Sequence, residues 1–190
     1  MNPKHILNES DQKALLSLAR ETVREGARAG RMPQGPDVAT PLLKSKRGVF
    51  VTLHQEGALR GCIGFPYPVK PLVEACREAA FAAAFEDPRF PRVVEEEVDG
   101  LEFEISVLSP PEPIRPEDVR VGVHGLYFRQ GSRSGLLLPQ VATEYGWTAG
   151  EFLSQTCRKA GLPPDAWKAG GDLFGFEAQI FNETDMKKRG

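Results

Sequence analysis

The chain has 190 residues, a length that suits one domain or one domain with two subdomains. Hydrophobic residues make up 41% and charged residues 26% of it, values that are ordinary for a folded globular protein and exclude a disordered chain. The 24 basic and 26 acidic side chains give a formal net charge of −2, which excludes a strong long-range attraction to nucleic acid or to an anionic membrane. The most apolar run, residues 79–85, is far too short to cross a bilayer.

The cysteines indicate a reducing compartment. Cys62, Cys76 and Cys157 are odd in number, and their spacing matches no disulfide or zinc pattern. The first residues contain no apolar run of signal-peptide length. We therefore expect a cytoplasmic protein with no metal site and no cofactor.

The first half of the chain predicts a helix, a loop and a hairpin. Apolar residues recur at four-residue spacing from Leu15 to Ala27, which predicts an amphipathic helix over residues 11–28 with Ser10 as its N-cap. Glycines and prolines over residues 30–41 predict a long loop. Two strand-like runs then surround a turn in residues 48–64, which is typical of a β-hairpin.

Two registers of this hairpin can be weighed. A two-residue turn at Glu56 and Gly57 would mix apolar Val51 and Leu53 with polar side chains on one face. A three-residue loop over residues 55–57 separates the two kinds, because it leaves one face for Phe50, Thr52, His54, Arg60 and Cys62. We favour the three-residue loop, which opposes Cys62 to Phe50 and Arg60 to Thr52, and which places glycine last in the loop.

The second half predicts shorter elements of both kinds. An alanine-rich helix over residues 71–87 ends before a proline, and alternation predicts a strand over residues 101–109. A capping box at Thr148 opens a helix that ends before Gly161. The remaining predictions are strands at 119–123, 126–130, 135–138 and 173–181 and a short helix at 140–145. Because the elements lack regular βαβ spacing, we expect an α+β fold with a mostly antiparallel sheet flanked by helices.

Cys62 is the first candidate for chemistry. Arg60 is two residues earlier, so on a strand it shares a face with Cys62 at roughly 6–7 Å. A nearby guanidinium favours the thiolate and lowers a pKa that is otherwise about 8.5. Gly61 and Gly64 would let a substrate approach the backbone. The alternative is a small buried cysteine with a packing role only.

Five further residues are candidates for the same site. His124 lies between two predicted strands and is the expected acid or base, with a turn histidine as the alternative. Asp87 and Arg89 follow the alanine-rich helix, where they either close the helix end or bind a phosphate or carboxylate. Glu104 projects from the polar face of its strand, either solvated or paired with an arginine, and Gln140 either orients a ligand amide or caps a short helix.

Several blocks of this sequence resemble one family. The hexapeptide LRGCIG at 59–64 is similar to the signature of the AMMECR domain family, and further blocks follow the family order over roughly residues 13–183. These are GVFVTL at 48–53, EDPRFPRV at 86–93, EISVLSPPEPI at 104–114, HGL at 124–126, GLLLPQVATEYGW at 135–147 and FLSQTCRKAGLPPDAW at 152–167. The resemblance implies a single AMMECR-type domain over residues 1–190, or two subdomains within it.

The resemblance also carries expectations about architecture and partners. Members of the family look like α+β domains with a larger and a smaller lobe, and LRGCIG lies near the cleft between them. The family has no established activity, and its fold has been grouped with one that binds nucleic acids, nucleotides or peptides. Such domains are often encoded beside, or fused to, Memo-like and radical SAM proteins, which implies partners in a shared modification pathway.

Three functions remain open on these grounds. The first is a thiol-dependent transferase or modifying enzyme for an anionic, nucleotide-like or macromolecular substrate, with Cys62 and His124 as its catalytic residues. Arg60, Gly61, Gly64, Asp87, Arg89, Glu104 and Gln140 would then bind the substrate. The second is a non-catalytic module that binds a nucleotide, a nucleic acid or a peptide. The third is a scaffold for Memo-like and radical SAM partners.

Overall fold

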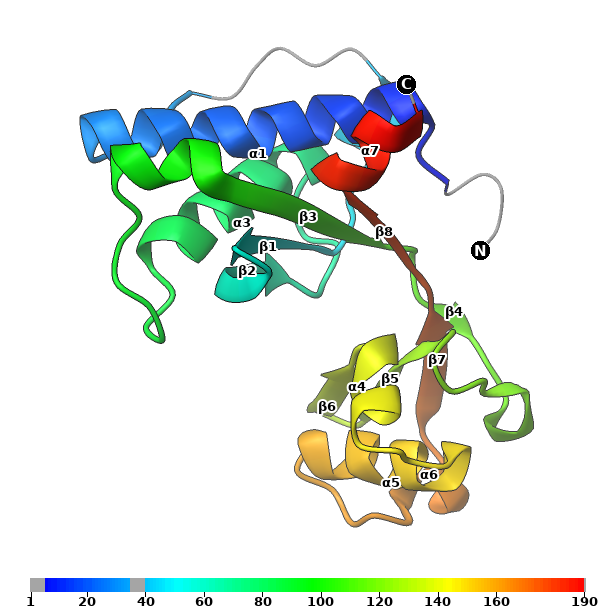
Figure 1. The fold of residues 1–190 in the computed structure, drawn as a ribbon. Helices are drawn as coiled ribbons and strands as arrows, with labels where there is room; N and C mark the ends of the chain where they lie inside the picture. The colour runs from blue at the N-terminus through cyan, green and yellow to red at the C-terminus, as the bar shows by residue number, and fades with distance from the viewer. Residues whose placement is uncertain (1–5, 35–39, 190) are drawn as a thin grey trace. The chain divides into compact units, whose positions relative to one another are not determined.

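The computed structural model describes residues 6–34 and 40–189, which form two compact units. The larger unit runs up to Leu108 and resumes at Gln179, whereas the smaller unit spans Ser109–Ala178 (Figure 1). Each unit contains a four-stranded sheet and helices, so the predicted α+β class is confirmed. All the strand pairs β1–β2, β1–β3, β4–β7, β5–β6 and β5–β7 are antiparallel.

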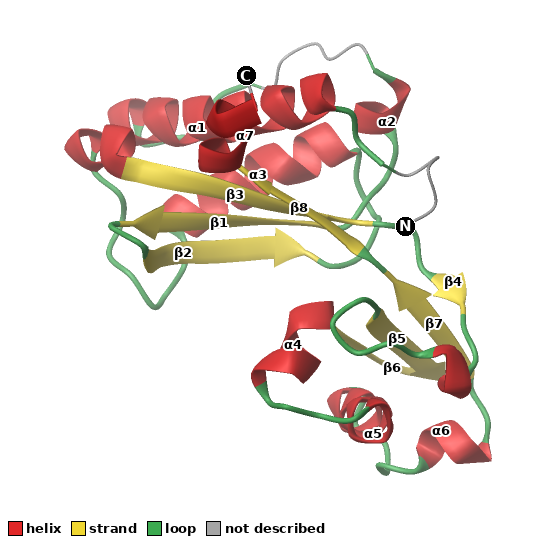
Figure 2. Cartoon of the chain, turned by 45° about the vertical axis from the view of Figure 1, so that its right-hand side comes forward, coloured by secondary structure: helices red, strands yellow, loops and turns green. Residues whose placement is uncertain are grey.

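The larger unit packs helices against one face of its sheet. Its strands follow the order β2-β1-β3-β8, and α1 and α3 lie on the same side of them (Figure 2). The elements are α1 (Glu9–Ala29), α2 (Pro41–Lys44), β1 (Val49–Gln55), β2 (Ala58–Phe65), α3 (Leu72–Phe85), the 3-10 helix η2 (Glu95–Gly100), β3 (Leu101–Leu108), β8 (Ala178–Asn182) and α7 (Glu183–Arg189).

Alternation in β1 and β3 builds the core of this unit. Val51 opposes Ile105 and Leu53 opposes Phe103, and all four side chains are fully buried. Residues two apart on a strand share a face, so the intervening polar side chains lie on the opposite face of the sheet. That second face is half-buried and carries Thr52.

Helix α1 confirms the predicted helix over residues 11–28 but begins earlier. Its N-cap is Asn8, whose side chain accepts a hydrogen bond of 2.8 Å from the backbone N–H of Asp11. The prediction of Ser10 as the N-cap is therefore wrong, because Ser10 already lies within the first turn. Gly30 ends the helix in a left-handed conformation with φ 67°.

The register of the β1–β2 hairpin differs from the one we favoured. Glu56 and Gly57 form a two-residue turn in which both have positive φ. A bulge at Arg60 then shifts the pairing by one residue, so that Cys62 opposes Thr52 rather than Phe50. Ile63 lies on the face of Val51, as expected, whereas Leu59 opposes His54 and is exposed, because the extra residue sits in the bulge at Arg60 and not in the loop.

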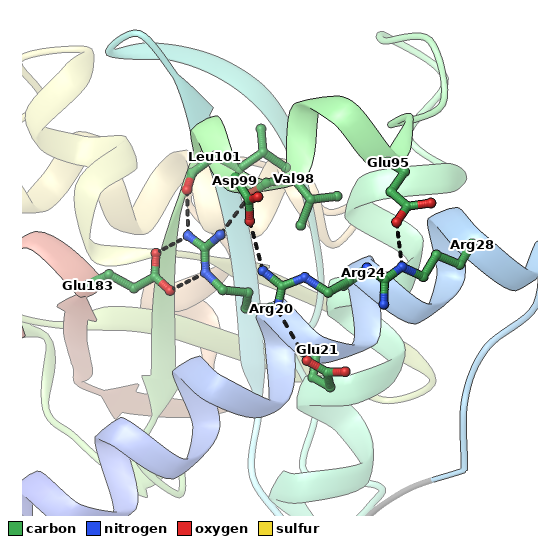
Figure 3. A network of polar contacts seen from close by, with 9 residues as sticks. All are labelled: Arg20, Glu21, Arg24, Arg28, Glu95, Val98, Asp99, Leu101 and Glu183. Atoms are coloured by element: carbon green, nitrogen blue, oxygen red, sulfur yellow. Dashed lines mark hydrogen bonds and ion pairs between the residues drawn. The ribbon is translucent and has the colours of Figure 1, made fainter.

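Three arginines of α1 form hydrogen bonds and ion pairs with α7 and η2 (Figure 3). Arg20 forms two parallel hydrogen bonds of 2.7 and 2.5 Å with the Glu183 carboxylate, and it also donates to the carbonyl oxygens of Val98 and Leu101. Its guanidinium lies 4.7 Å from the centre of the Phe103 ring. Farther along α1, Arg24 pairs with Asp99 and Arg28 with Glu95.

The substitution Arg20→Lys is expected to lower the free energy of unfolding by about 1–2 kcal/mol, because an ammonium cannot reproduce the fork that serves a carboxylate and two carbonyls. Urea denaturation measures the change. Arg28→Lys is the matched control: its pair with Glu95 is half-exposed, so we expect a change within about 0.5 kcal/mol. Equal losses in the two variants would contradict the assignment.

The smaller unit has the strand order β4-β7-β5-β6. Thr148 and Glu151 form the predicted capping box, and α5 ends just before Gly161, as expected. The elements are β4 (Glu112–Pro113), the 3-10 helix η3 (Pro116–Asp118), β5 (Gly125–Gln130), β6 (Arg133–Leu137), α4 (Pro139–Glu144), α5 (Ala149–Lys159), α6 (Ala166–Ala169) and β7 (Asp172–Phe176).

Two strand predictions for this part of the chain are wrong. Residues 119–123 form a turn, in which the carbonyl oxygen of Arg120 accepts hydrogen bonds from the N–H groups of Val123 and His124. The predicted strand 173–181 consists of two strands, β7 and β8, that belong to different sheets. The chain changes sheets at Glu177, which exchanges hydrogen bonds with Ser109. Alternation continues through Glu177, so periodicity does not reveal the break.

Candidate functional site

A row of three side chains crosses the half-buried face of the larger sheet. Cys62 of β2 opposes Thr52 of β1, and Thr52 in turn opposes Glu104 of β3. We call these three residues the thiol row. The hydroxyl of Thr52 donates a hydrogen bond of 3.2 Å to the sulfur of Cys62. Sulfur is a weak acceptor, so this bond orients the Thr52 hydroxyl toward Cys62.

The three cysteines differ in their access to solvent. Cys62 is half-buried, whereas Cys76 and Cys157 are completely buried. Burial raises the pKa of Cys76 to about 12 and also raises the pKa of Cys157. Cys62 is therefore the most exposed of the three cysteines.

Asp87 binds the backbone of Cys62 at the outer edge of the sheet. Cys62 forms a pair with Thr52 that leaves its own N–H and C=O directed away from β1. Its N–H donates to Oδ2 of Asp87 at 2.9 Å, and its carbonyl oxygen accepts from Nη2 of Arg89 at 3.1 Å. The loop after α3 thus satisfies an edge strand that would otherwise expose both groups.

Asp87 and Arg89 form the charged part of this edge. The Asp87 side chain is 1% exposed and accepts three hydrogen bonds from Arg89, from the backbone N–H, Nε and Nη2. The Arg89 guanidinium, more than burial or the Cys62 amide, sets the pKa of Asp87 and holds it far below the usual value. The pKa of Arg89 is raised, chiefly by its hydrogen bond with Asp87 and also by the charge of that carboxylate. Half of the Arg89 side chain stays exposed.

The sequence predicted that Arg60 contacts Cys62, but in the structure Arg60 binds Glu97 and Pro91. Its guanidinium donates two hydrogen bonds to the Glu97 carboxylate and one of 2.8 Å to the carbonyl oxygen of Pro91. Burial raises the pKa of Glu97, but hydrogen bonds from Arg60 and from the Val94 N–H outweigh burial and lower it. Because the bulge removes Arg60 from the regular strand pattern, the guanidinium that contacts Cys62 is that of Arg89, and it binds the backbone carbonyl oxygen.

Close packing explains why Gly61 and Gly64 of LRGCIG have no side chain. A Cβ at Gly61 would lie 2.1 Å from the carbonyl oxygen of Ala83 in α3. A Cβ at Gly64 would lie 2.4 Å from the ring of Phe50. The space beside each glycine, which we expected a substrate to use, is occupied by this chain itself.

A small polar cavity lies at the far end of the thiol row. It has a volume of about 210 Å³ and is lined by Glu104, by Glu102, by His54, which opposes Glu102, by Gly57 and by Asn182. Glu104 therefore points to a hollow and not to Arg60 or Arg89, whose hydrogen bonds go to Glu97 and Asp87.

His124 and Gln140 belong to the smaller unit, whereas Cys62 belongs to the larger. The Nδ1 atom of His124 accepts a hydrogen bond of 3.2 Å from the backbone N–H of Arg120. Burial and the charge of Arg120 lower the pKa of His124, so at neutral pH the ring is uncharged with its proton on Nε2. Gln140 lies in the first turn of α4, and its backbone carbonyl accepts from the Thr143 hydroxyl at 3.0 Å.

Comparison with known sequences decides the family. The sequence profile of AMMECR1 matches residues 16–181. The chain belongs to the AMMECR1 family. A relative from Methanothermobacter thermautotrophicus is 49% identical and covers 93% of this chain and 96% of its own. The chain also resembles the crystal structure of an uncharacterized protein from Pyrococcus horikoshii, with 48% identity, 90% of each chain covered and a TM-score of 0.74.

Two residues that contact the LRGCIG strand of this AMMECR1 domain escaped the sequence analysis. Thr52 was placed on the face of Cys62 but was not selected as a site residue; a polar side chain within VFVTL was the signal that could have found it. Glu97, the partner of Arg60, lies among three consecutive glutamates, and nothing in the sequence distinguishes it from its neighbours.

The structure describes residues 6–34 and 40–189 of this AMMECR1 domain. Within these ranges no three His, Cys, Asp or Glu side chains are grouped so that they could hold a metal ion. Within the same ranges no helix combines the length and the apolar character that crossing a membrane requires.

Proposed function

We propose that the larger unit carries a thiol-dependent transfer site for an anionic substrate. Cys62 is the nucleophile, Arg89 binds the anionic group, and Asp87 is a positioning residue that holds both. The observation that carries this proposal is the arrangement at Cys62, a half-buried residue whose sulfur accepts the Thr52 hydroxyl and whose backbone carbonyl oxygen accepts the half-exposed guanidinium of Arg89.

The proposed reaction consists of two balanced steps. The Cys62 sulfur attacks an electrophilic carbon of the group to be transferred, so an S–C bond forms while the bond to the leaving group breaks. The leaving group departs with the bonding electron pair and takes the proton that the thiol gave up. A second nucleophile then attacks the same carbon, loses its own proton, and restores the thiol.

We assign the remaining candidates from their surroundings. His124 stays a predicted acid or base of the smaller unit, where its Nδ1 accepts the Arg120 N–H. Glu104 and the small polar cavity beside it would receive the part of the substrate that extends along the thiol row.

Alkylation of the folded protein tests the nucleophile. With iodoacetamide at pH 7.5 and mass-spectrometric mapping, we expect Cys62 to react at least about tenfold faster than Cys76 or Cys157, whose thiols are buried. Arg89→Gln and Thr52→Val should each slow the labelling of Cys62, since each removes a group that stabilises the thiolate. Cys62→Ser supplies the unlabelled control.

Two results would overturn the proposal. Equal and slow labelling of the three cysteines would leave a non-catalytic binding module as the better interpretation. Labelling of Cys62 that is unchanged in Arg89→Gln and in Thr52→Val would show that the surrounding groups do not activate the sulfur.

A further inference from the structure

A column of three polar side chains on β3 meets the thiol row at Glu104. Glu102, Glu104 and Ser106 are two residues apart along this strand, so all three lie on the half-buried face of the larger sheet, with roughly 6–7 Å between neighbours. We call these three residues the β3 column. Two strand spacings, about 9–10 Å, separate Glu104 from Cys62 at the other end of the row.

Ser106 is the most buried member of the β3 column. It is 8% exposed, yet its hydroxyl forms no hydrogen bond with the described residues. Among those residues, side-chain polar atoms that lack both a partner and accessible surface belong to Thr22, Arg77 and Trp167. Ser106 is outside that group, so its unpaired oxygen keeps accessible surface. An unpaired hydroxyl on a residue buried to more than nine-tenths points to a ligand atom that completes its hydrogen bonding.

The two glutamates of the β3 column lack a positive partner. Glu102 and Glu104 are both half-buried, and neither carboxylate forms a hydrogen bond or an ion pair with the described residues. The polar cavity that both of them line has no lysine or arginine among its described lining residues. Two like charges close together on a partly buried surface repel each other, and a cation bound beside them removes that repulsion.

We propose that the β3 column binds an ammonium group of the substrate on which the thiol row acts. The ammonium donates one hydrogen bond to the carboxylate of Glu104 and one to the hydroxyl of Ser106, and Glu102 adds a second negative charge nearby. An ammonium has three N–H donors and no acceptor, so it suits a site whose side chains all offer acceptor oxygens.

This inference rests on the proposed transfer site and narrows its substrate class. Arg89 binds the anionic group at the outer edge of β2, whereas the β3 column lies on the other side of Cys62. The substrate is therefore dipolar: it carries an acid near the carbon that Cys62 attacks and an amine roughly two strand spacings away from that carbon. A purely anionic metabolite does not meet this requirement.

Labelling rates with two matched chloroacetamides at pH 7.5 test the ammonium site. N-(5-aminopentyl)chloroacetamide carries an amine, and N-(5-hydroxypentyl)chloroacetamide has the same length without the charge. We expect the amine probe to label Cys62 at least about tenfold faster than the alcohol probe. Glu104→Gln and Ser106→Ala should each lower this ratio about threefold or more. Glu74→Gln, which changes an exposed acid of α3, should leave the ratio unchanged.

Ser106→Ala gives a reading that a purely structural role cannot produce. Because the hydroxyl has no partner in the free protein, its removal should leave the melting temperature unchanged or higher while the preference for the amine probe falls. Equal labelling rates for the two probes in the native protein would overturn the proposal. A ratio that is the same in the native protein, in Glu104→Gln and in Ser106→Ala would also overturn it.

Cys62→Ser separates the ammonium site from the thiol chemistry. In this variant pentylamine should still shift the amide NMR signals of Glu104 and Ser106, and pentan-1-ol should not. If pentylamine produces no such shift, the β3 column is not an ammonium site, however fast Cys62 reacts. If the shift occurs but Cys62 of the native protein reacts as slowly as Cys76, the ammonium site stands and the transfer site is refuted.

Discussion

Replacing Asp87 with asparagine is expected to lower the free energy of unfolding by about 2–3 kcal/mol. The buried carboxylate accepts hydrogen bonds from the Cys62 N–H and from three nitrogens of Arg89. An asparagine has one oxygen and one NH₂ group, so it faces some of these donors with a donor of its own. Urea denaturation at pH 7 measures the loss, and labelling of Cys62 should change in the same variant because the edge of β2 is released.

The same substitution has a defined pH dependence. The pKa of Asp87 is lowered in the folded protein, chiefly by Arg89, so its stabilising contribution is complete above the unfolded pKa of about 3.9 and is lost as the pH falls toward the folded pKa. The stability difference between the native protein and Asp87→Asn should therefore be constant from pH 7 to 5 and shrink below about pH 4. A difference that stays constant down to pH 2.5 would contradict the assignment.

Asp172→Asn is the matched control for this effect. Asp172 also accepts two hydrogen bonds from one arginine, Arg129, but both side chains are about half-exposed. Solvent weakens such a pair, and we expect a loss below about 1 kcal/mol. A comparable loss in the two variants would mean that burial of Asp87 at the edge of β2 adds nothing to the free energy of unfolding.

Gly61→Ala is expected to destabilise the larger unit by about 3 kcal/mol or to prevent its folding. The added methyl group would lie 2.1 Å from the carbonyl oxygen of Ala83, so β2 and α3 would have to separate. The backbone of α3 cannot yield as a side chain would, since Ala83 lies in the last turn of a helix whose end is packed into the core. Thermal denaturation measures the effect.

Gly100→Ala controls for the loss of a glycine. No atom lies within 4 Å of the position that its Cβ would take, and its φ does not require glycine. We expect a change within about 0.5 kcal/mol, or a slight gain from the smaller entropy of the unfolded chain. If Gly61→Ala proved as neutral as Gly100→Ala, the close packing of β2 on α3 would be refuted.

The hairpin separates what pattern alone can predict from what it cannot. Alternation in β1 determined which side chains are buried, and the structure confirms that Val51 and Leu53 are in the core. The turn and the register came out wrong, because an extra residue can be accommodated in a loop or in a bulge with the same hydrophobic pattern. The hydrogen bonds of Arg60 to Glu97 and Pro91 accompany the bulge, and both partners are more than thirty residues away.

The site shows the same division. The sequence identified Cys62, Asp87 and Arg89, and the structure brings these three together within hydrogen-bonding distance. The sequence analysis placed the Arg60 guanidinium next to Cys62, because residues two apart on a strand share a face. Arg89 takes that position through the loop after α3, which folds back on the edge of β2 for reasons of backbone hydrogen bonding.

Local patterning by itself determined the α+β class, α1, α3, β1, β3 and the capped helix α5, because hydrophobic period and capping act over a few residues. Tertiary structure alone decided the bulge, the break of residues 173–181 into β7 and β8, and the partners of Arg60 and Arg89. Those features depend on contacts between residues that are far apart in the chain. The local hydrophobic pattern carries no information about the free energy of such contacts. Ser109 and Glu177 illustrate this, since their mutual hydrogen bonds place one continuous alternating segment in two sheets.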